Sequence, residues 1–455
     1  MILTIYNQFV EPSRFECIFI ANLAEISLGL IPFLEPSEVE VEIAEDHALS
    51  DRFIFSLPEN SILITPHPID KYFWQDSLAL LSRKNVLNFF PKTIEKSVCE
   101  AVINDKPLFA TLVATIKNNP GLSLISYAGT KEFFALIDKL QSLNLQFFTP
   151  EVPESKNRWT ASFFGSKSGF RQAASALDSP FPSLPPGIIS TDQSEIIGAA
   201  SHFLTTSDGC VLKNNRGLAG AGLHILRTEA ITGDPGQEVA AVVAKHHYFQ
   251  KTPVVVERFI PPDMSICGGA PNIELKIAGG EVTPLYVCSM RVTAEGVFQG
   301  VEFGKDAVSD NLTQVLISAG EKYGQALLDY GYNGFFEIDF VQGLDSKTYP
   351  IESNLRRTGG THAFELAGKL IGPDFLKTHY IVTNNRVAAS KFEGMPYQSL
   401  KTQLSDLCYP LNGKKIGLIL TIISPLSFGR LGYVVIGTDR KEALDIEKQF
   451  LSRLN

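Results

Sequence analysis

The chain has 455 residues, of which 44% are hydrophobic and 20% are charged, with a formal net charge of −9. This balance is that of a globular protein, and the length allows roughly two to four domains with sizeable cores. The negative net charge argues against a nucleic-acid-binding protein, which would present a basic surface.

The cysteines and the apolar runs exclude several other classes. The six cysteines lie far apart without a Cys-x-x-Cys pair, which indicates reduced thiols and excludes the usual zinc spacings. The first residues lack the basic region and the cleavage site of a signal peptide. The most apolar run, 416–423, is far too short to span a bilayer. We therefore expect a soluble cytoplasmic protein with no membrane partner.

The first part of the chain, residues 1–155, alternates short apolar runs with amphipathic stretches. The runs at 61–65 and 122–126 predict strands, and the pattern over 132–140 predicts a helix, as in an α/β lobe. A polar passage at 150–157 marks the first domain boundary.

A second unit is expected over residues 156–380, with a glycine-rich subdomain at about 190–260 and a second lobe at about 261–380. Its patterns predict, in chain order, a helix at 168–178, a strand at 209–213, a helix at 238–245, a strand at 253–257, a hairpin of 273–277 with 282–287, an amphipathic helix at 309–330, a hairpin of 334–341 with 349–354, and a helix at 363–370. The tail, 381–455, is predicted to form a small α/β domain with strands near 416–423 and 432–436 and a helix near 440–453. The fold class is therefore α/β.

Two acids and an amide lie on the second predicted hairpin. Asp339 is in the strand 334–341, and Glu352 and Asn354 are in the strand 349–354. Period-two geometry can aim all three at one face, where converging oxygen ligands suit Mg²⁺ held together with substrate phosphates. The alternative is ordinary polar residues at strand ends, but buried carboxylates are rarely left without a partner. The hairpin therefore predicts a metal site.

Other polar residues accompany this hairpin. Arg356 stands two residues after Asn354, points the same way, and can meet a transferring phosphoryl group or an oxyanion. Glu337 shares a strand face with Asp339 and is a candidate second acid. Glu274 is another candidate acid of the site, and the sequence decides neither role.

A lysine and three glycines mark the end of the predicted strand 209–213. Lys213 ends the strand, and Gly217, Gly220 and Gly222 follow it. Glycines let the backbone approach a phosphate and turn its N–H groups towards it. The spacing is neither a Rossmann fingerprint nor a Walker A loop, and a plain mobile turn is the alternative. Lys213 directly before the glycines favours phosphate binding.

Upstream, Lys167 stands at the start of the predicted helix 168–178. A helix N-terminus beside a lysine is a candidate phosphate site. A capped surface helix is the alternative.

The segment after Arg356 combines cations, glycines and hydroxyls. Its residues are Arg357, Thr358, Gly359, Gly360, Thr361 and His362. We expect them to bind substrate: Arg357 and His362 suit a substrate carboxylate, and His362 alternatively deprotonates an attacking amine. A turn in which Thr361 caps the following helix is the alternative interpretation.

In their order and spacing these parts resemble the ATP-grasp superfamily over about residues 160–375. Its strands end in an acid and then Glu-x-Asn, often with an arginine two residues later, and a lysine and a flexible glycine hairpin lie upstream. The resemblance implies an adenine-binding hinge at Glu257, Phe259 and Ile260, with Asp263 at a ribose hydroxyl. A strand running into a Pro-Pro turn is the alternative.

The same resemblance implies two further roles. Lys167 would bind phosphate, although Ser166 stands where many members have an acid. Arg291 would face the transferred group, unless it is a solvated charge at a strand end.

A narrower resemblance rests on Asn-Leu-Arg at 354–356 followed by Gly-Gly-Thr-His at 359–362. This run is similar to the pheganomycin-type peptide ligases, which have a pre-ATP-grasp domain, an ATP-grasp domain and a small C-terminal domain. The motif at 425–432 is similar to their C-terminal domain. Arg357 lies where we expect that subfamily to vary, which leaves the substrate contacts open.

The resemblance implies an ADP-forming carboxylate–amine ligase that joins amino acids or short peptides in a biosynthetic pathway through an acyl phosphate. ATP and Mg²⁺, or Mn²⁺ in its place, would be the cofactors, and Arg291, Arg356 and His362 the catalytic residues. Dimers are common in the superfamily, so a homodimer stays open. The alternatives are a phosphotransferase acting on a hydroxyl and a non-catalytic ATP-binding regulatory protein, which would normally lack a metal ligand.

Overall fold

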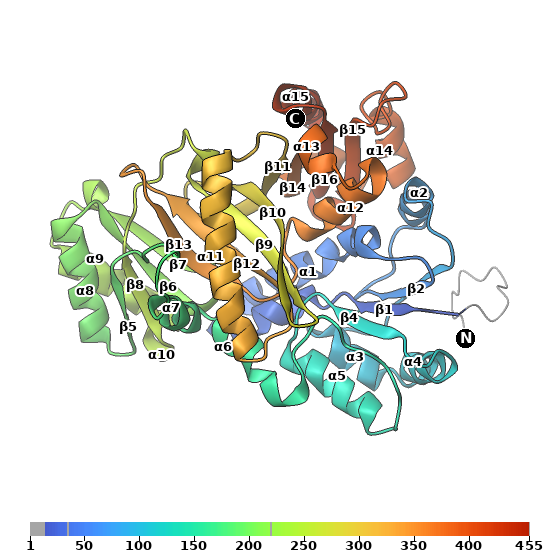
Figure 1. The fold of residues 1–455 in the computed structure, drawn as a ribbon, viewed down its shortest axis with the longest axis horizontal. Coiled ribbons are helices and arrows are strands. Elements are labelled where there is room, and N and C mark those ends of the chain that lie inside the picture. Colours follow the sequence, from blue (N-terminus) through green and yellow to red (C-terminus); the bar gives the residue numbers. More distant parts are fainter. Residues whose placement is uncertain (1–13, 34–35, 219–220, 455) are drawn as a thin grey trace.

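The computed structural model describes residues 14–33, 36–218 and 221–454, and within them the strands form three sheets (Figure 1). A parallel sheet belongs to the first lobe, an antiparallel sheet to the glycine-rich subdomain, and a larger antiparallel sheet to the rest of the chain. No helix within these residues combines the length and the apolarity needed to cross a bilayer.

The first lobe is built on a parallel sheet with the strand order β3-β2-β1-β4. Its elements are β1 (Cys17–Ile20), α1 (Pro36–Ala48), the 3₁₀ helix η3 (Leu49–Ser56), β2 (Ser61–Ile64), α2 (Lys71–Leu80), β3 (Val86–Phe89), α3 (Val98–Asn104), α4 (Lys106–Asn118), β4 (Ser123–Ser126) and α5 (Lys131–Gln141). Ile18 and Ile20 pack under α3, α4 and α5, whereas Phe19 between them packs against η3. Both faces are thus covered, which explains the uninterrupted apolar strands. The predicted strands at 61–65 and 122–126 and the helix at 132–140 are confirmed.

The glycine-rich subdomain is an antiparallel sheet with the order β5-β8-β6-β7. Its elements, with the two helices that precede it, are α6 (Trp159–Phe164), α7 (Lys167–Ser175), β5 (Gly187–Ser190), α8 (Gln193–Thr206), β6 (Gly209–Leu218), β7 (Ala221–Arg227), α9 (Pro235–Lys245), α10 (Tyr248–Lys251) and β8 (Val254–Arg258). Apolar residues of α8 and α9, among them Ile196 and Val239, form one core with Leu212 and Val256 of the sheet. The predicted helix at 238–245 and strand at 253–257 are confirmed.

The largest sheet has the order β13-β12-β9-β10-β11-β14-β16-β15. Its elements and the helices around it are β9 (Pro271–Ala278), β10 (Glu281–Val292), β11 (Phe298–Gly304), α11 (Asp310–Asp329), β12 (Gly334–Gln342), β13 (Thr348–Asn354), α12 (Thr361–Ile371), α13 (Phe375–Thr378), β14 (Tyr380–Ala388), α14 (Tyr397–Gln403), β15 (Gly417–Ile422), β16 (Arg430–Gly437) and α15 (Arg440–Leu454). Leu316 and Tyr323 of α11 are buried with Ile273 and Leu275 of β9. Val315, which the periodicity places on the apolar stripe, is 41% exposed, so the stripe is narrower than predicted.

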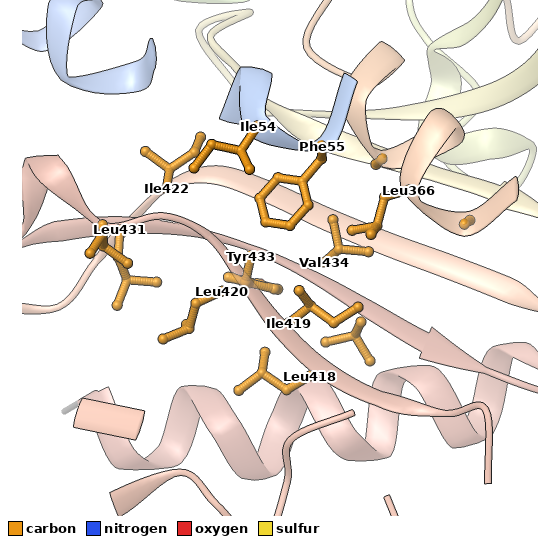
Figure 2. Packing of buried hydrophobic residues seen from close by; sticks show 14 of the residues in the cluster. Ile54, Phe55, Leu366, Leu418, Ile419, Leu420, Ile422, Leu431, Tyr433 and Val434 are labelled. Carbon is orange, nitrogen blue, oxygen red and sulfur yellow. The ribbon is translucent and has the colours of Figure 1, made fainter. Parts of the chain in front are cut away.

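The tail continues the central sheet instead of forming a sheet of its own. Val382 of β14 pairs with Glu302 of β11, and β16 and β15 follow outward. Figure 2 shows Ile54 and Phe55 of η3 packed against Leu366 of α12 and against β15 and β16. The first lobe and the tail therefore share one core, while the domain limits at 155 and 380 stay predictions.

Candidate active site

A cavity of about 1470 Å³ lies between the β6–β7 hairpin, the β12–β13 hairpin and the first lobe. The predicted site residues in its wall are Lys167, Lys213, Gly217, Gly222, Glu257, Phe259, Ile260, Asp339, Glu352, Asn354, Arg356 and Gly359. Gly220 lies outside the described residues. The segments predicted to bind phosphate and metal therefore meet at one cavity.

The acids of β12 and β13 converge as the strand periodicity predicts. Asp339 pairs directly with Glu352 across the two strands, and Glu337 pairs with Asn354. The Asn354 side-chain amide donates to Glu337 at 3.0 Å and to Asp339 at 3.3 Å. The Asn272 amide from β9 also donates to Asp339 and to Glu337. Amide donors thus orient the carboxylates, while their role as metal ligands stays a prediction.

The charges of this cluster are strongly coupled. Burial, together with the neighbouring Glu337 and Glu352, raises the pKa of Asp339 well above its usual range. Burial also disfavours the charged form of Glu352, but Lys167 and Lys213 outweigh it and lower the pKa of Glu352 to about 2. The surroundings therefore disfavour the charged form of Asp339 and favour the charged form of Glu352. A cation bound between them would favour the charged form of both carboxylates.

The donor set fits a cation that arrives with a nucleotide. Among the described residues, no three His, Cys, Asp or Glu side chains are grouped so as to hold a metal ion by themselves. Mg²⁺, however, usually takes one or two carboxylates and completes its shell with phosphate oxygens and water. Asp339 and Glu352 supply such a partial shell. The Asn354 amide turns its nitrogen to these acids and its oxygen to Arg356, so its predicted role as a ligand would need the amide to rotate.

Both predicted phosphate-binding lysines pair with acids of the site. Lys213 is buried, and its Nζ lies 2.6 Å from Glu257 and 2.9 Å from the Ile351 carbonyl. Lys167 forms an ion pair with Glu352. Ser166 caps α7 by accepting the Gly169 N–H at 3.1 Å, so the capped-helix interpretation also holds. Both ammonium groups lie in the cavity wall, where phosphate oxygens can replace their acid partners.

Glu257, predicted to belong to the adenine-binding hinge, forms ion pairs inside the protein instead. Glu257 is buried between Arg171, at 2.7 Å, and Lys213, so its carboxylate positions the lysine. The Phe259 amide donates to the Gly209 carbonyl at 2.9 Å within the sheet and is not free for a ligand. An adenine contact at this hinge would therefore use a group other than the Phe259 backbone amide.

Asp263 does not reach the cavity wall, although Pro262 and Met264 on either side of it do. Its carboxylate accepts from the Ser265 amide at 2.9 Å and from the Ser265 hydroxyl at 2.6 Å. This local turn is typical of aspartate. The placement of Asp263 therefore gives no support to the ribose contact, which stays a prediction.

Arg291 and Arg357, predicted to face the transferred group and the substrate, both lie outside the cavity wall. Arg291 of β10 forms an ion pair with Glu447 of α15. Arg357 is 6% exposed and holds Glu151 through two hydrogen bonds, of 2.9 and 3.0 Å, and Glu365 through one of 2.8 Å. These acids neutralise both cations, so the structure gives them tertiary partners instead of ligands.

The threonines after Arg357 also turn away from the cavity and bind an acid. The hydroxyls of Thr358 and Thr361 donate to Glu274 at 2.7 Å each, and the Tyr286 hydroxyl donates to it at 2.8 Å. Burial, followed by Glu337, raises the pKa of Glu274 to about 7. Glu274 is thus a buried anchor for this turn, and not an acid of the cavity wall.

Of the remaining residues in this turn, one lines the cavity and two lie outside its wall. Gly359 lines the cavity, whereas Gly360 is covered by Tyr286, whose hydroxyl would lie 2.3 Å from an added Cβ. His362 is buried outside the wall, and burial lowers its pKa well below the usual range. A buried neutral imidazole away from the cavity does not support the predicted base.

No family model matches the sequence, and no curated protein matches it. The fold, in contrast, is similar to solved structures over nearly the whole chain. Biotin carboxylase from Campylobacter jejuni, in a complex with β-γ-ATP, has a TM-score of 0.58 at 14% identity and covers 97% of this chain and 92% of its own. An N5-carboxyaminoimidazole ribonucleotide synthetase with ADP has a TM-score of 0.55 at 12% identity, covering 98% and 97%. The Aspergillus clavatus N5-carboxyaminoimidazole synthase, in complex with ADP, has a TM-score of 0.54 at 10% identity, covering 98% and 99%.

The chain has the ATP-grasp fold. The predicted α/β class and ATP-grasp architecture are confirmed. At these identities the likeness concerns the ATP-grasp fold alone, so the pheganomycin-type subfamily and a homodimer stay predictions.

Within this ATP-grasp fold, the first lobe and β14 add wall residues that sequence reasoning missed: Asp46, Arg52, Tyr127 and Arg386. Arg52 carried no distinctive signal, because it follows the polar residues Ser50 and Asp51 directly before the short apolar run 53–55. No spacing connects these residues to the acid hairpin, since three of them come from the first lobe and Arg386 comes from β14, at a distance along the chain.

Proposed function

We propose that the protein is an ATP-dependent carboxylate–amine ligase that forms an amide or peptide bond between amino acid or short peptide substrates. The observation that carries the proposal is the single cavity in which Lys213 and the β6–β7 hairpin meet Asp339, Glu352 and Arg356. The similar proteins solved with β-γ-ATP or ADP support the nucleotide part of this proposal.

Six charged or polar wall residues have a chemical role in the proposed reaction. Lys167 and Lys213 bind the phosphates, while Asp339, Glu352 and Asn354 would hold Mg²⁺, which neutralises phosphate charge when bound. A carboxylate oxygen of the first substrate attacks the γ-phosphorus, the bond to the β-phosphate oxygen breaks, and ADP leaves.

The second half of the reaction forms the amide. An amine attacks the acyl carbon, the bond to the phosphate oxygen breaks, and phosphate leaves while the amine loses a proton. Arg356 stabilises the charge that develops on the oxygens. Closure of the glycine hairpin would keep water from the acyl phosphate.

The test is ADP and phosphate release from Mg·ATP over a matrix of amino acids and short peptides, with products weighed by mass spectrometry. We expect ADP only when two organic substrates are present, and a product mass equal to their sum minus water. Asp339→Asn should abolish release, while the surface variant Asp374→Asn, whose side chain is 75% exposed, serves as matched control. ADP with one phosphorylated substrate would instead assign a phosphotransferase, and no ADP despite tight ATP binding would overturn both.

A further inference from the structure

Arg52 is a buried cation that has no anionic partner among the residues the structure describes. It lies in η3, is 3% exposed and lines the cavity, and its Nε has no hydrogen-bond partner within the same residues. Within the described residues its guanidinium contacts the rings of Phe53 at 5.4 Å and Tyr127 at 5.2 Å, and no carboxylate lies within ion-pair distance. Burying a charge without a partner is unfavourable, so the site is incomplete as it stands.

Asp46, the acid that acts most strongly on Arg52, and Asp51, its neighbour in the chain, already have other partners. Asp46 accepts from Arg386 at 3.1 Å. Asp51 accepts from the amide of Ser424 at 2.6 Å and from its hydroxyl at 2.8 Å. Burial lowers the pKa of Arg52, Tyr127 raises it, and the like charges of Arg386 and Arg356 lower it again. Among the described residues, Arg386 is paired with Glu45 and Asp46, whereas the Arg52 guanidinium has no counterion of its own.

Tyr127 connects Arg52 to the metal end of the cavity. The Arg356 guanidinium lies 5.8 Å from the same ring and donates to the Asn354 amide oxygen at 2.9 Å. The acids of the metal site act on Arg356, whereas none of them is among the charges that act most strongly on Arg52. Both arginines thus lie beside the Tyr127 ring, but Arg356 is at the metal end of the cavity and Arg52 is away from it.

We propose that Arg52 binds a second anionic group of the carboxylate substrate, about one tyrosine ring away from the carboxylate that reacts at the metal end. The inference rests on the proposed ligase function and names its substrate class. The substrate is a diacid, such as an acidic amino acid, a peptide ending in one, or an acid that carries a phosphate. The planar guanidinium can donate two hydrogen bonds to a carboxylate or to a phosphate, and either anion would neutralise its buried charge.

The test is binding of glutarate, inorganic phosphate and acetate to the full chain, measured by thermal shift at constant ionic strength. Wild type should be stabilised by glutarate or by phosphate, and the stronger probe identifies the second group. The affinity should fall roughly 10- to 100-fold in Arg52→Met and stay unchanged in Arg453→Met, a surface cation paired with Asp406. Acetate, with a single carboxylate, should bind more weakly than the better probe.

Arg52→Lys keeps the positive charge but loses the planar guanidinium, so it should bind the probe with intermediate affinity. This variant keeps the test decisive if Arg52→Met fails to fold. Equal stabilisation of wild type and Arg52→Met, or no stabilisation of wild type by any probe, would overturn the inference. Because binding needs neither ATP nor an amine, the two proposals fail separately. Turnover of a diacid with an unchanged KM in Arg52→Met removes this inference and leaves the ligase. Binding that depends on Arg52, without any ADP release, supports this inference and removes the ligase proposal.

Discussion

Replacing Arg357 with methionine should destabilise the protein more than it affects ligand binding. The guanidinium makes hydrogen bonds of 2.9 and 3.0 Å to Glu151 and of 2.8 Å to Glu365, and it lies 4.2 Å from the Phe335 ring. In the variant, Glu151 keeps only Lys276, at 3.0 Å, as an ionic partner. Removing one partner of a buried ion pair costs about 3–5 kcal/mol, and we expect a loss in this range.

The assay is urea unfolding followed by fluorescence, at pH about 8 and about 3, which lie on either side of the ordinary glutamate pKa of 4.5. In wild type, burial opposes ionisation of Glu151 but Arg357 outweighs it and lowers the pKa of that carboxyl. Its stabilising contribution is therefore present above the unfolded pKa and is lost as the pH falls through the folded pKa. The deficit of Arg357→Met should accordingly shrink towards low pH. The double variant Glu151→Leu/Arg357→Met should lose at least about 2 kcal/mol less than the two single losses together.

A loss below about 1 kcal/mol in Arg357→Met, combined with weaker substrate binding, would refute this reasoning. It would mean that Glu151 and Glu365 do not hold the cation in solution. The substrate-binding role expected for Arg357 from its neighbouring glycines would then stand again.

Three further outcomes are expected. Asp339→Asn should reduce ADP release by at least about 100-fold while the affinity for ATP without metal changes little, because only the cation site is altered; unchanged release would remove the metal assignment. Since the pKa of Glu274 is raised from 4.5 to about 7 in the folded state, the contribution of this carboxyl to stability should be fully present below pH about 4.5 and fall by up to about 3 kcal/mol as the pH rises through 7. Unfolding titrations should show this as a difference in slope between wild type and Glu274→Gln. Gly300→Ala should lower the unfolding free energy by about 1–3 kcal/mol, because the added Cβ would lie 2.1 Å from the Thr383 carbonyl oxygen; wild-type stability would show that β11 and β14 adjust freely.

Local patterns were sufficient for the strands that carry the acids. The run 334–341 and the run 349–354 pair as β12 and β13, and period-two geometry brings Asp339, Glu352 and Asn354 together. The glycine hairpin is equally local, because Lys213 and Gly217 belong to one strand, β6. Such contacts depend on neighbours in sequence, so the residues alone predict them.

By itself, the sequence determined the α/β class, the acid hairpin and the lysine before the glycines, all of which follow from short-range periodicity and chain order. The tertiary structure alone decided which cations stay available to a ligand. Arg357 meets Glu151 from 206 positions away, and Arg291 meets Glu447 from 156 positions away, whereas in the described part of the chain Arg52 meets no acid within ion-pair distance. The interaction of a cation with its counterion depends on the distance between them in space, and their separation along the chain does not predict that distance.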